Sequence, residues 1–247
     1  NRRLALLARQ DPLTSALNRH AFQAMRSGIG GSERGTVALV DIDNLKVIND
    51  TVGHETGDLL LKEVARRLRE LVREEDTIAR LGGDEFVAVL EELDADIRSA
   101  MARAGLVADK LLHAFALPYL LNGEEFICTA STGIVIFRDQ ESSIEDILKH
   151  SDLAMYGAKK SGRNVVRFFD PAMQHELERR TRLEADLRRS LTDQQLRLYC
   201  QSQVDQTGKV IGAEVLLRWQ HPERGLVPPM DFIPFAEEIG LIIPIGQ

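Results

Sequence analysis

Two glycines and two acids stand together in the stretch 80–86, which reads Arg-Leu-Gly-Gly-Asp-Glu-Phe. Apolar residues precede and follow this stretch, so the pattern predicts a strand, a tight turn and a second strand. Gly82 and Gly83 permit backbone angles or close approaches that a side chain would prevent. Such a turn can present backbone amides, Asp84 and Glu85 to a phosphate and its metal ion, although the same residues also occur in ordinary surface turns.

A second acidic segment lies upstream. The apolar residues 37–40 run directly into Asp41. If this strand neighbours the glycine hairpin, Asp41 and Asp84 converge at one edge of a sheet. Mg²⁺ prefers oxygen ligands and usually takes only one or two carboxylates from a protein. The pair therefore predicts a Mg²⁺ or Mn²⁺ site and does not suit zinc or iron.

Alternating helices and strands must position these acids. Apolar periodicity predicts helices at 18–25, 56–72, 95–115, 144–160 and 171–191. It predicts strands at 36–41, 125–137, 165–169, 196–203 and 212–219, in addition to the two strands of the glycine hairpin. This order predicts an α/β (α+β) fold in which helices cover a mainly antiparallel sheet.

Four groups of motifs, in this order, resemble the GGDEF family of bacterial diguanylate cyclases, which join two GTP molecules into cyclic di-GMP. The motifs are Asp11 to Thr14 with Asn18-Arg19, the block 41–58, the stretch 82–86 and the segment 151–164. The resemblance implies a ferredoxin-like sheet of the nucleotidyl-cyclase type. It also implies a domain that occupies residues 1–169.

The same resemblance assigns the catalytic residues. Asp41, Asp84 and the carbonyl of Ile42 match the metal ligands, and Gly82 and Gly83 match the substrate-binding turn. Metal ions that bridge the phosphates lower the pKa of the attacking 3′-hydroxyl. Glu85 is a candidate to assist that deprotonation, and the alternative is an exposed acid at a strand start.

Asn49 and Asp58 match the family's guanine-reading pair. A carboxylate accepts from guanine N1–H and the 2-amino group, while an amide both donates and accepts along the same edge. Adenine would leave Asp58 unpaired. The alternative places Asn49 in a turn and Asp58 at the cap of a helix that begins near Leu59.

Three cations, Lys46, Lys159 and Arg163, match family positions near the triphosphate. Lys159 and Arg163 lie four residues apart, so on a helix they would face the same way. The alternative is that they complement the helix dipole at a helix end.

Arg73 and Asp76 match the RxxD inhibitory site of the family, at which the product binds away from the catalytic face. Arginine can read guanine O6 and N7 through two parallel hydrogen bonds. The resemblance thus predicts feedback inhibition by cyclic di-GMP.

Residues 170–247 differ in character from the preceding domain. After a helix rich in Arg and Glu, they resemble the opening of an EAL domain, the phosphodiesterase that linearises cyclic di-GMP. Glu214 matches its first metal carboxylate, Arg218 matches a substrate-phosphate contact, and Gln201 is expected in the same pocket. The family fold is a TIM-like barrel of about 250 residues, so we expect only its beginning here and no hydrolysis from this segment alone.

Composition limits the partners. A net charge of −7 and a pI near 5.5 argue against a nucleic-acid surface. Cys128 and Cys200 lack metal spacing and are expected to be reduced thiols in a cytoplasmic protein. No apolar run approaches the ~20 residues of a membrane span. Residues 1–10 read as the tail of a helix that continues from an upstream domain, through which the parent protein could be tethered to a membrane.

Two functions therefore remain open. As an enzyme, the first domain would need a homodimer, because each set of residues holds one GTP and cyclisation requires two. As a binding module, it would hold GTP or cyclic di-GMP without turnover and regulate the attached phosphodiesterase. The intact set of candidate residues favours the enzyme.

Overall fold

The computed structural model of the 247-residue chain describes residues 9–24, 34–91, 97–138 and 143–246. The chain divides into two compact units, Asn1–Met173 and Gln174–Gln247. Each unit is described by itself. Three parts of the sequence-based expectations lie outside the described residues: the helical tail at 1–8, the helix end at Met25 and the helix start at 95–96.

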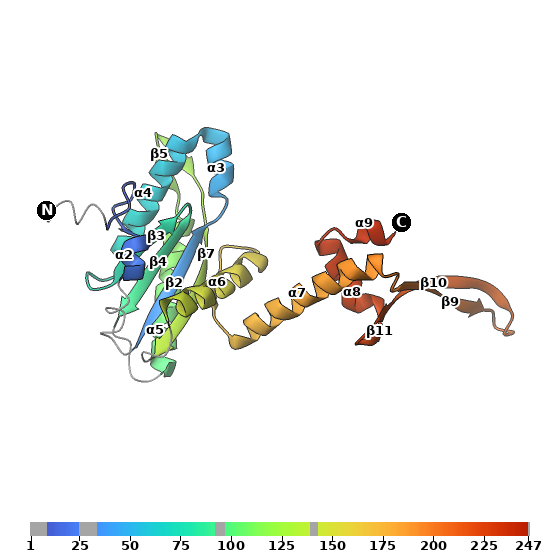
Figure 1. The fold of residues 1–247 in the computed structure, drawn as a ribbon. Helices are drawn as coiled ribbons and strands as arrows, with labels where there is room; N and C mark the ends of the chain where they lie inside the picture. Colours follow the sequence, from blue (N-terminus) through green and yellow to red (C-terminus); the bar gives the residue numbers. More distant parts are fainter. Residues whose placement is uncertain (1–8, 25–33, 92–96, 139–142, 247) are drawn as a thin grey trace. The chain divides into compact units, whose positions relative to one another are not determined.

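A mixed six-stranded sheet forms the centre of the first unit (Figure 1). In sheet order its strands are β1 (Leu17–Asn18), β3 (Thr77–Gly82), β4 (Glu85–Glu91), β2 (Arg34–Ile42), β7 (Ala130–Arg138) and β8 (Val166–Phe168). The four inner strands pair antiparallel, and β1 and β8 pair parallel at the two edges. The expected mainly antiparallel sheet is confirmed.

Helices cover both faces of this sheet. They are α2 (Arg19–Ala24), α3 (Leu45–Val52), α4 (His54–Leu71), α5 (Ile97–Ala116) and α6 (Ile144–Lys160). Successive residues of a strand point to opposite faces. Val37 and Leu39 of β2 accordingly pack in the cluster with α2 and α6, whereas Val40 packs in the cluster with α4 and α5.

The order β2, α4, β3, β4, α5, β7 is the β-α-β-β-α-β arrangement of ferredoxin-like folds. In the sheet these four strands lie as β3-β4-β2-β7, so β2 and the hairpin strand β4 are direct neighbours. The expected fold class is confirmed. The C-terminal end of β2 and the turn of the glycine hairpin therefore lie together where these inner strands end. We call this end of the sheet the acidic edge.

Two local expectations were incomplete. The sequence pattern does not predict α3, because this short helix buries only Leu45. The expected single strand at 125–137 is wrong, because β5 (Tyr119–Leu121) and β6 (Glu124–Phe126) form a separate hairpin and β7 begins only at Ala130. The hairpin turns at Asn122-Gly123, where both residues have positive φ, and Asn-Gly is a strong hairpin signal.

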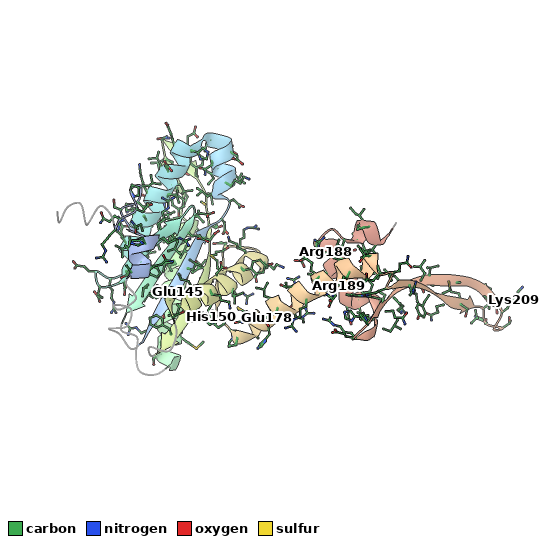
Figure 2. All side chains as sticks on the ribbon, in the orientation of Figure 1. Glu145, His150, Glu178, Arg188, Arg189 and Lys209 are labelled. Carbon is green, nitrogen blue, oxygen red and sulfur yellow. The ribbon has the colours of Figure 1, made fainter. Side chains whose placement is uncertain are left out.

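The second unit contains most of α7 (Pro171–Thr192) and a small antiparallel sheet. Its other elements are β9 (Leu196–Val204), β10 (Val210–His221), β11 (Gly225–Val227), α8 (Pro229–Glu238) and α9 (Ile242–Ile245). Trp219 and Phe232 lie fully buried in its core beside Leu187 of α7. Figure 2 shows Lys209 at the tip of the long β9–β10 hairpin. The expected helix and both expected strands are present.

Among the described residues, no helix combines the length and the apolar character that crossing a bilayer requires.

Gly133 sets how closely α6 approaches β7. A Cβ at this position would lie 2.0 Å from the carbonyl oxygen of Ser151 and 2.4 Å from the amide nitrogen of Met155, and both are backbone atoms of α6. Because a helix backbone cannot yield as a side chain can, we expect Gly133→Ala to lower the free energy of unfolding by about 3 kcal/mol. Chemical denaturation measures this change.

Gly105 provides the matched control, since it lies inside α5 and a Cβ there meets no atom within 4 Å. Gly105→Ala should raise the free energy of unfolding by about 0.5–1 kcal/mol, because alanine favours a helix interior. Equal effects of the two substitutions would contradict the tight contact of α6 with β7.

Candidate functional site

The end of β2 and the turn of the glycine hairpin meet at one sheet edge. In the antiparallel register of β2 with β4, Asp41 lies opposite Glu85. The amide of Ile42 donates a hydrogen bond of 3.2 Å to the carbonyl oxygen of Asp84. The pairing of two strands distant in sequence thus places Asp41 and Asp84 beside each other.

Two arginines hold the hairpin turn by its backbone. Gly82 and Gly83 have φ values of 140° and 54°, which favour glycine. Arg80 donates to the carbonyl oxygen of Gly83 at 2.7 Å, and Arg19 donates through Nε to the carbonyl oxygen of Leu81 at 2.9 Å. The shape of the turn therefore depends on side chains from outside it as well as on its glycines.

Asp11 in turn holds Arg80 in place. Its Oδ1 lies 3.1 Å from Arg80 Nη1 and also accepts from the amide and hydroxyl of Thr14. Partial burial raises the pKa of Asp11, but the hydrogen bonds from Thr14 and Arg80 outweigh it and leave the pKa below its usual value. The motif at 11–14 therefore supports the glycine hairpin, and no sequence-based reasoning had assigned it this role.

Asp41 is a nearly buried acid that pairs with a lysine. Its side chain is only 8% exposed, and Lys159 Nζ lies 2.7 Å from Oδ2. Burial raises the pKa of Asp41 to about 6, and the negative charges of Asp84 and Asp43 also raise it, although Lys159 opposes them. Because burial and neighbouring negative charges disfavour the ionised form of Asp41, a further positive charge nearby would stabilise that form.

Asp43 is the site residue that sequence reasoning missed. Its side chain is 1% exposed and accepts hydrogen bonds from the hydroxyls of Thr129 at 2.7 Å and Ser131 at 2.8 Å. It also accepts from the amide of Asn164 at 3.2 Å, and Arg163 Nε lies 4.0 Å away. The alternation Asp41-Ile42-Asp43, with its period of two, was the available signal. Asp43 connects the end of β2 to the turn after α6.

Lys159 and Arg163 converge on the acids, but not for the reason expected. The helix α6 ends at Lys160, and Arg163 has a φ of 62°, so the two cations do not share one helix face. Lys159 instead reaches Asp41, while Arg163 reaches Asp43 from the turn beyond the helix. The two cations lie near each other because their partners, Asp41 and Asp43, are two residues apart at the end of β2.

Asn49 and Asp58 lie on the two helices that follow β2. Asn49 is in the last turn of α3, and its carbonyl oxygen accepts from the amide of Gly53 at 3.0 Å. Asp58 is exposed in the second turn of α4, which begins at His54. The alternative in which Asp58 caps a helix starting near Leu59 is therefore wrong.

Two further candidates of this edge, Glu85 and Lys46, are more exposed than Asp41. Glu85 begins β4, and its carboxylate lies 3.7 Å from Arg19 in an ion pair. Lys46 is exposed in the first turn of α3. The Ile42 side chain is buried and carries no ligand atom, so the candidate ligand of this residue is its backbone carbonyl.

Arg73 and Asp76 form a compact turn after α4. The Asp76 carboxylate accepts from the amide of Arg73 at 2.8 Å, and the amide of Asp76 donates to the Arg73 carbonyl oxygen at 3.2 Å. Both residues line a hollow of about 320 Å³ together with Arg103 and Lys110 of α5. Three cationic side chains at one hollow suit an anionic ligand.

In the second unit, Gln201 and Glu214 are direct cross-strand partners of β9 and β10. Arg218 lies four residues after Glu214 on the same strand, so the two share one face. Both Gln201 and Glu214 are exposed. The structure thus brings the three expected residues of this unit to one sheet.

The donor set at the Asp41 edge fits a hard divalent cation. Within the described residues, no three His, Cys, Asp or Glu side chains form a metal cluster. Two carboxylates and a carbonyl are nevertheless what Mg²⁺ usually takes from a protein, since it keeps waters and substrate phosphates as its other ligands. The elevated pKa of Asp41 agrees, because a bound cation would stabilise its ionised form.

Comparison with known families matches both units. The family model described as "Diguanylate cyclase, GGDEF domain" matches residues 8–165, and the model described as "EAL domain" matches residues 184–247. Among solved structures, a GGDEF domain of PA1120 (TpbB or YfiN) from Pseudomonas aeruginosa is 31% identical, with a TM-score of 0.61. That match covers 68% of this chain and 99% of the other.

Two curated relatives extend over both units. The chain is 41% identical to MucR of Pseudomonas aeruginosa, named a bifunctional diguanylate cyclase/cyclic di-GMP phosphodiesterase, over 100% of this chain and 36% of MucR. It is 36% identical to PdeR of Escherichia coli, named a cyclic di-GMP phosphodiesterase, over 99% of this chain and 37% of PdeR. The chain spans about a third of the length of these relatives.

The pKa of Asp41 predicts a pH-dependent stability in the presence of EDTA. The folded carboxyl binds its proton more tightly than the unfolded one, whose pKa is near 3.8. Its contribution to stability is therefore complete below pH 3.8 and is lost as the pH rises through about 6. At pH 7.5, Asp41→Asn should unfold with a free energy about 1–3 kcal/mol higher than the parent.

Denaturation of both proteins between pH 4 and pH 8 measures this difference, which should shrink toward the acidic end of the range. A constant difference across the range would show that Asp41 does not ionise unfavourably in the folded protein.

Proposed function

The chain belongs to the GGDEF family of diguanylate cyclases and continues into the start of an EAL domain, and on this basis we propose that residues 1–169 condense two GTP molecules into cyclic di-GMP. Residues 170–247 then form a connecting helix and the beginning of a phosphodiesterase domain. The observation that carries the proposal is the convergence of Asp41, Asp84 and Lys159 at one sheet edge. A protein that uses this edge for phosphoryl chemistry needs both acids and a cation there.

Asp41, Asp84 and the Ile42 carbonyl would hold Mg²⁺ or Mn²⁺, which when bound supplies Lewis-acid polarisation of phosphate oxygens. In the reaction, the 3′-hydroxyl oxygen of each GTP bonds to the α-phosphorus of the other, and each of the two transfers releases one pyrophosphate. Glu85 at the start of β4 accepts the hydroxyl proton. The backbone of Gly82 and Gly83 gives the phosphates close access to the turn.

The cations of the site bind the triphosphate. Lys159, which lies against Asp41, would contact the triphosphate, and Arg163 extends from the turn that Asp43 holds. Lys46, exposed in the first turn of α3, is the third cation for the phosphates. In a protein of net charge −7, this local grouping is what retains an anionic substrate.

Asn49 and Asp58 read the guanine base. Asp58 accepts from guanine N1–H and the 2-amino group, and the Asn49 amide contributes the complementary hydrogen bond. Adenine offers an acceptor at N1, so it would leave Asp58 without a donor. Both residues follow β2 on consecutive helices, and the base would lie beside them.

The active form is a homodimer of this domain. Each subunit contributes one set of the residues above and holds one GTP, and cyclisation joins two. Because GTP is an intracellular nucleotide and both cysteines are free thiols, we place the domain in the cytoplasm.

A second candidate function is a domain that binds GTP or cyclic di-GMP without turnover and regulates an attached phosphodiesterase. The observation in its favour is the 36% identity to PdeR, which is named as a phosphodiesterase alone. In that case Glu214 would serve as a metal ligand and Arg218 as a phosphate contact of the EAL domain, beside Gln201. The full set of candidate cyclase residues in this chain favours the enzyme.

Incubation of the purified chain with GTP and Mg²⁺, followed by chromatography of the nucleotides, separates the two functions. We expect cyclic di-GMP and pyrophosphate from the parent and at least a 100-fold lower rate from Asp84→Asn, because the amide cannot supply the negative charge that the cation requires. EDTA should abolish the product. GTP that is bound but not converted by the parent would favour the regulatory domain.

We further propose that the product binds at Arg73 and Asp76 and inhibits the enzyme. The hollow that they line with Arg103 and Lys110 is cationic and lies on the α4 and α5 side of the domain, whereas the acidic edge faces Lys159 of α6. A cyclic dinucleotide carries two phosphates and two guanine edges, which the arginines can bind.

Titration of the cyclase with cyclic di-GMP tests this site. Arg73→Ala should raise the inhibitory concentration about tenfold or more, because it removes a charge-assisted contact. Glu74→Ala, an exposed change in the same turn, is the control and should leave inhibition unchanged. Equal inhibition of Arg73→Ala and the parent would remove the claim.

A further inference from the structure

The amide of Asn49 lies directly against Gly57. A Cβ at position 57 would lie 1.9 Å from Asn49 Oδ1, 3.0 Å from its Cγ and 3.5 Å from its Nδ2. These three atoms are the nearest that such a Cβ would meet, and all belong to the Asn49 side chain. The contact joins the last turn of α3 to the first part of α4, so Gly57 provides the space in which the amide lies.

This space accommodates the end of the Asn49 side chain. Asn49 Oδ1, the atom closest to Gly57, is buried and accepts no hydrogen bond among the described residues. The nitrogen Nδ2 is the end farther from Gly57. The space left by Gly57 thus determines where the Asn49 carboxamide lies, close against the backbone of α4.

Asp58 follows Gly57 directly and is exposed. Its carboxylate provides only acceptors, while Asn49 Nδ2 provides a donor. Guanine presents one acceptor, O6, next to two donors, N1–H and the 2-amino group, and therefore matches this combination. Adenine presents a donor at N6 and an acceptor at N1, which is the reverse.

Resting on the proposed use of Asn49 and Asp58 to read guanine, we propose that Gly57 is a positioning residue for specificity. The missing Cβ at this position leaves the space in which the Asn49 amide lies, and the amide so positioned, together with Asp58, selects guanine over adenine. Gly57 does not touch the nucleotide and acts only through Asn49.

The substitution Gly57→Ala separates this role from folding. The atoms in its way are the end of a flexible side chain, which can swing aside, and alanine favours a helix interior over glycine. The variant is therefore expected to fold with a thermal unfolding temperature at or above that of the parent. Gly105→Ala, in the open interior of α5, is the matched control.

Calorimetric binding of the non-cleavable α,β-methylene analogues of GTP and ATP, with Mg²⁺, provides the test on the full 247-residue chain. We expect Gly57→Ala and Asn49→Ala each to lose about tenfold in affinity for the GTP analogue, the loss of one base contact. Affinity for the ATP analogue should stay unchanged, so the ratio of the affinities for the GTP and ATP analogues should decrease. The double variant should bind the GTP analogue as Asn49→Ala does.

Parent-like discrimination by a folded Gly57→Ala variant would overturn the inference. So would a second, additive loss when Gly57→Ala is introduced into Asn49→Ala, because Gly57 would then act independently of the amide. A parent chain that fails to bind the GTP analogue overturns the proposed function itself, and with it this role of Gly57, whereas the first two outcomes leave the proposed function intact.

Discussion

The contact of 2.7 Å between the nearly buried Asp41 carboxylate and the partly exposed Lys159 ammonium is the interaction on which the site depends. It joins β2 to α6 and holds a negative charge that burial and two neighbouring acids disfavour. Such a group is costly unless it is paired. The crowding of acids at the acidic edge disfavours the ionised form of Asp41. The same crowding favours the binding of a divalent cation.

Several residues near this contact hold the turns and side chains of the site in position. Arg80 and Arg19 fasten the hairpin turn, and Asp43 fastens the turn beyond α6. Gly57 leaves room for the Asn49 amide. In each case a residue outside the proposed catalytic set determines the position of one within it. The candidate catalytic residues are therefore positioned by neighbouring residues that take no part in the proposed chemistry.

Much of the site could be predicted from sequence because its residues lie in short motifs whose elements are recognisable. The strand before Asp41 and the two strands of the hairpin are apolar runs interrupted by glycines, and such patterns depend on local backbone preferences. Sequence reasoning failed where local preference did not decide. Helix α3 buries only Leu45, and the expectation that Lys159 and Arg163 share a helix face is wrong because Arg163 lies beyond the end of α6 at Lys160.

By itself the sequence determined the alternation of helices and strands, because this follows from residue types and their spacing. The resemblance of its motifs to the GGDEF family then implied the ferredoxin-like sheet and most candidate residues. Only the tertiary structure decided that Asp43 binds the turn at 163–164, that Asp11 supports the hairpin through Arg80, and that Gly57 faces Asn49. These are contacts between elements distant along the chain or across a helix corner. Their existence depends on strand register and helix packing, which no local pattern encodes.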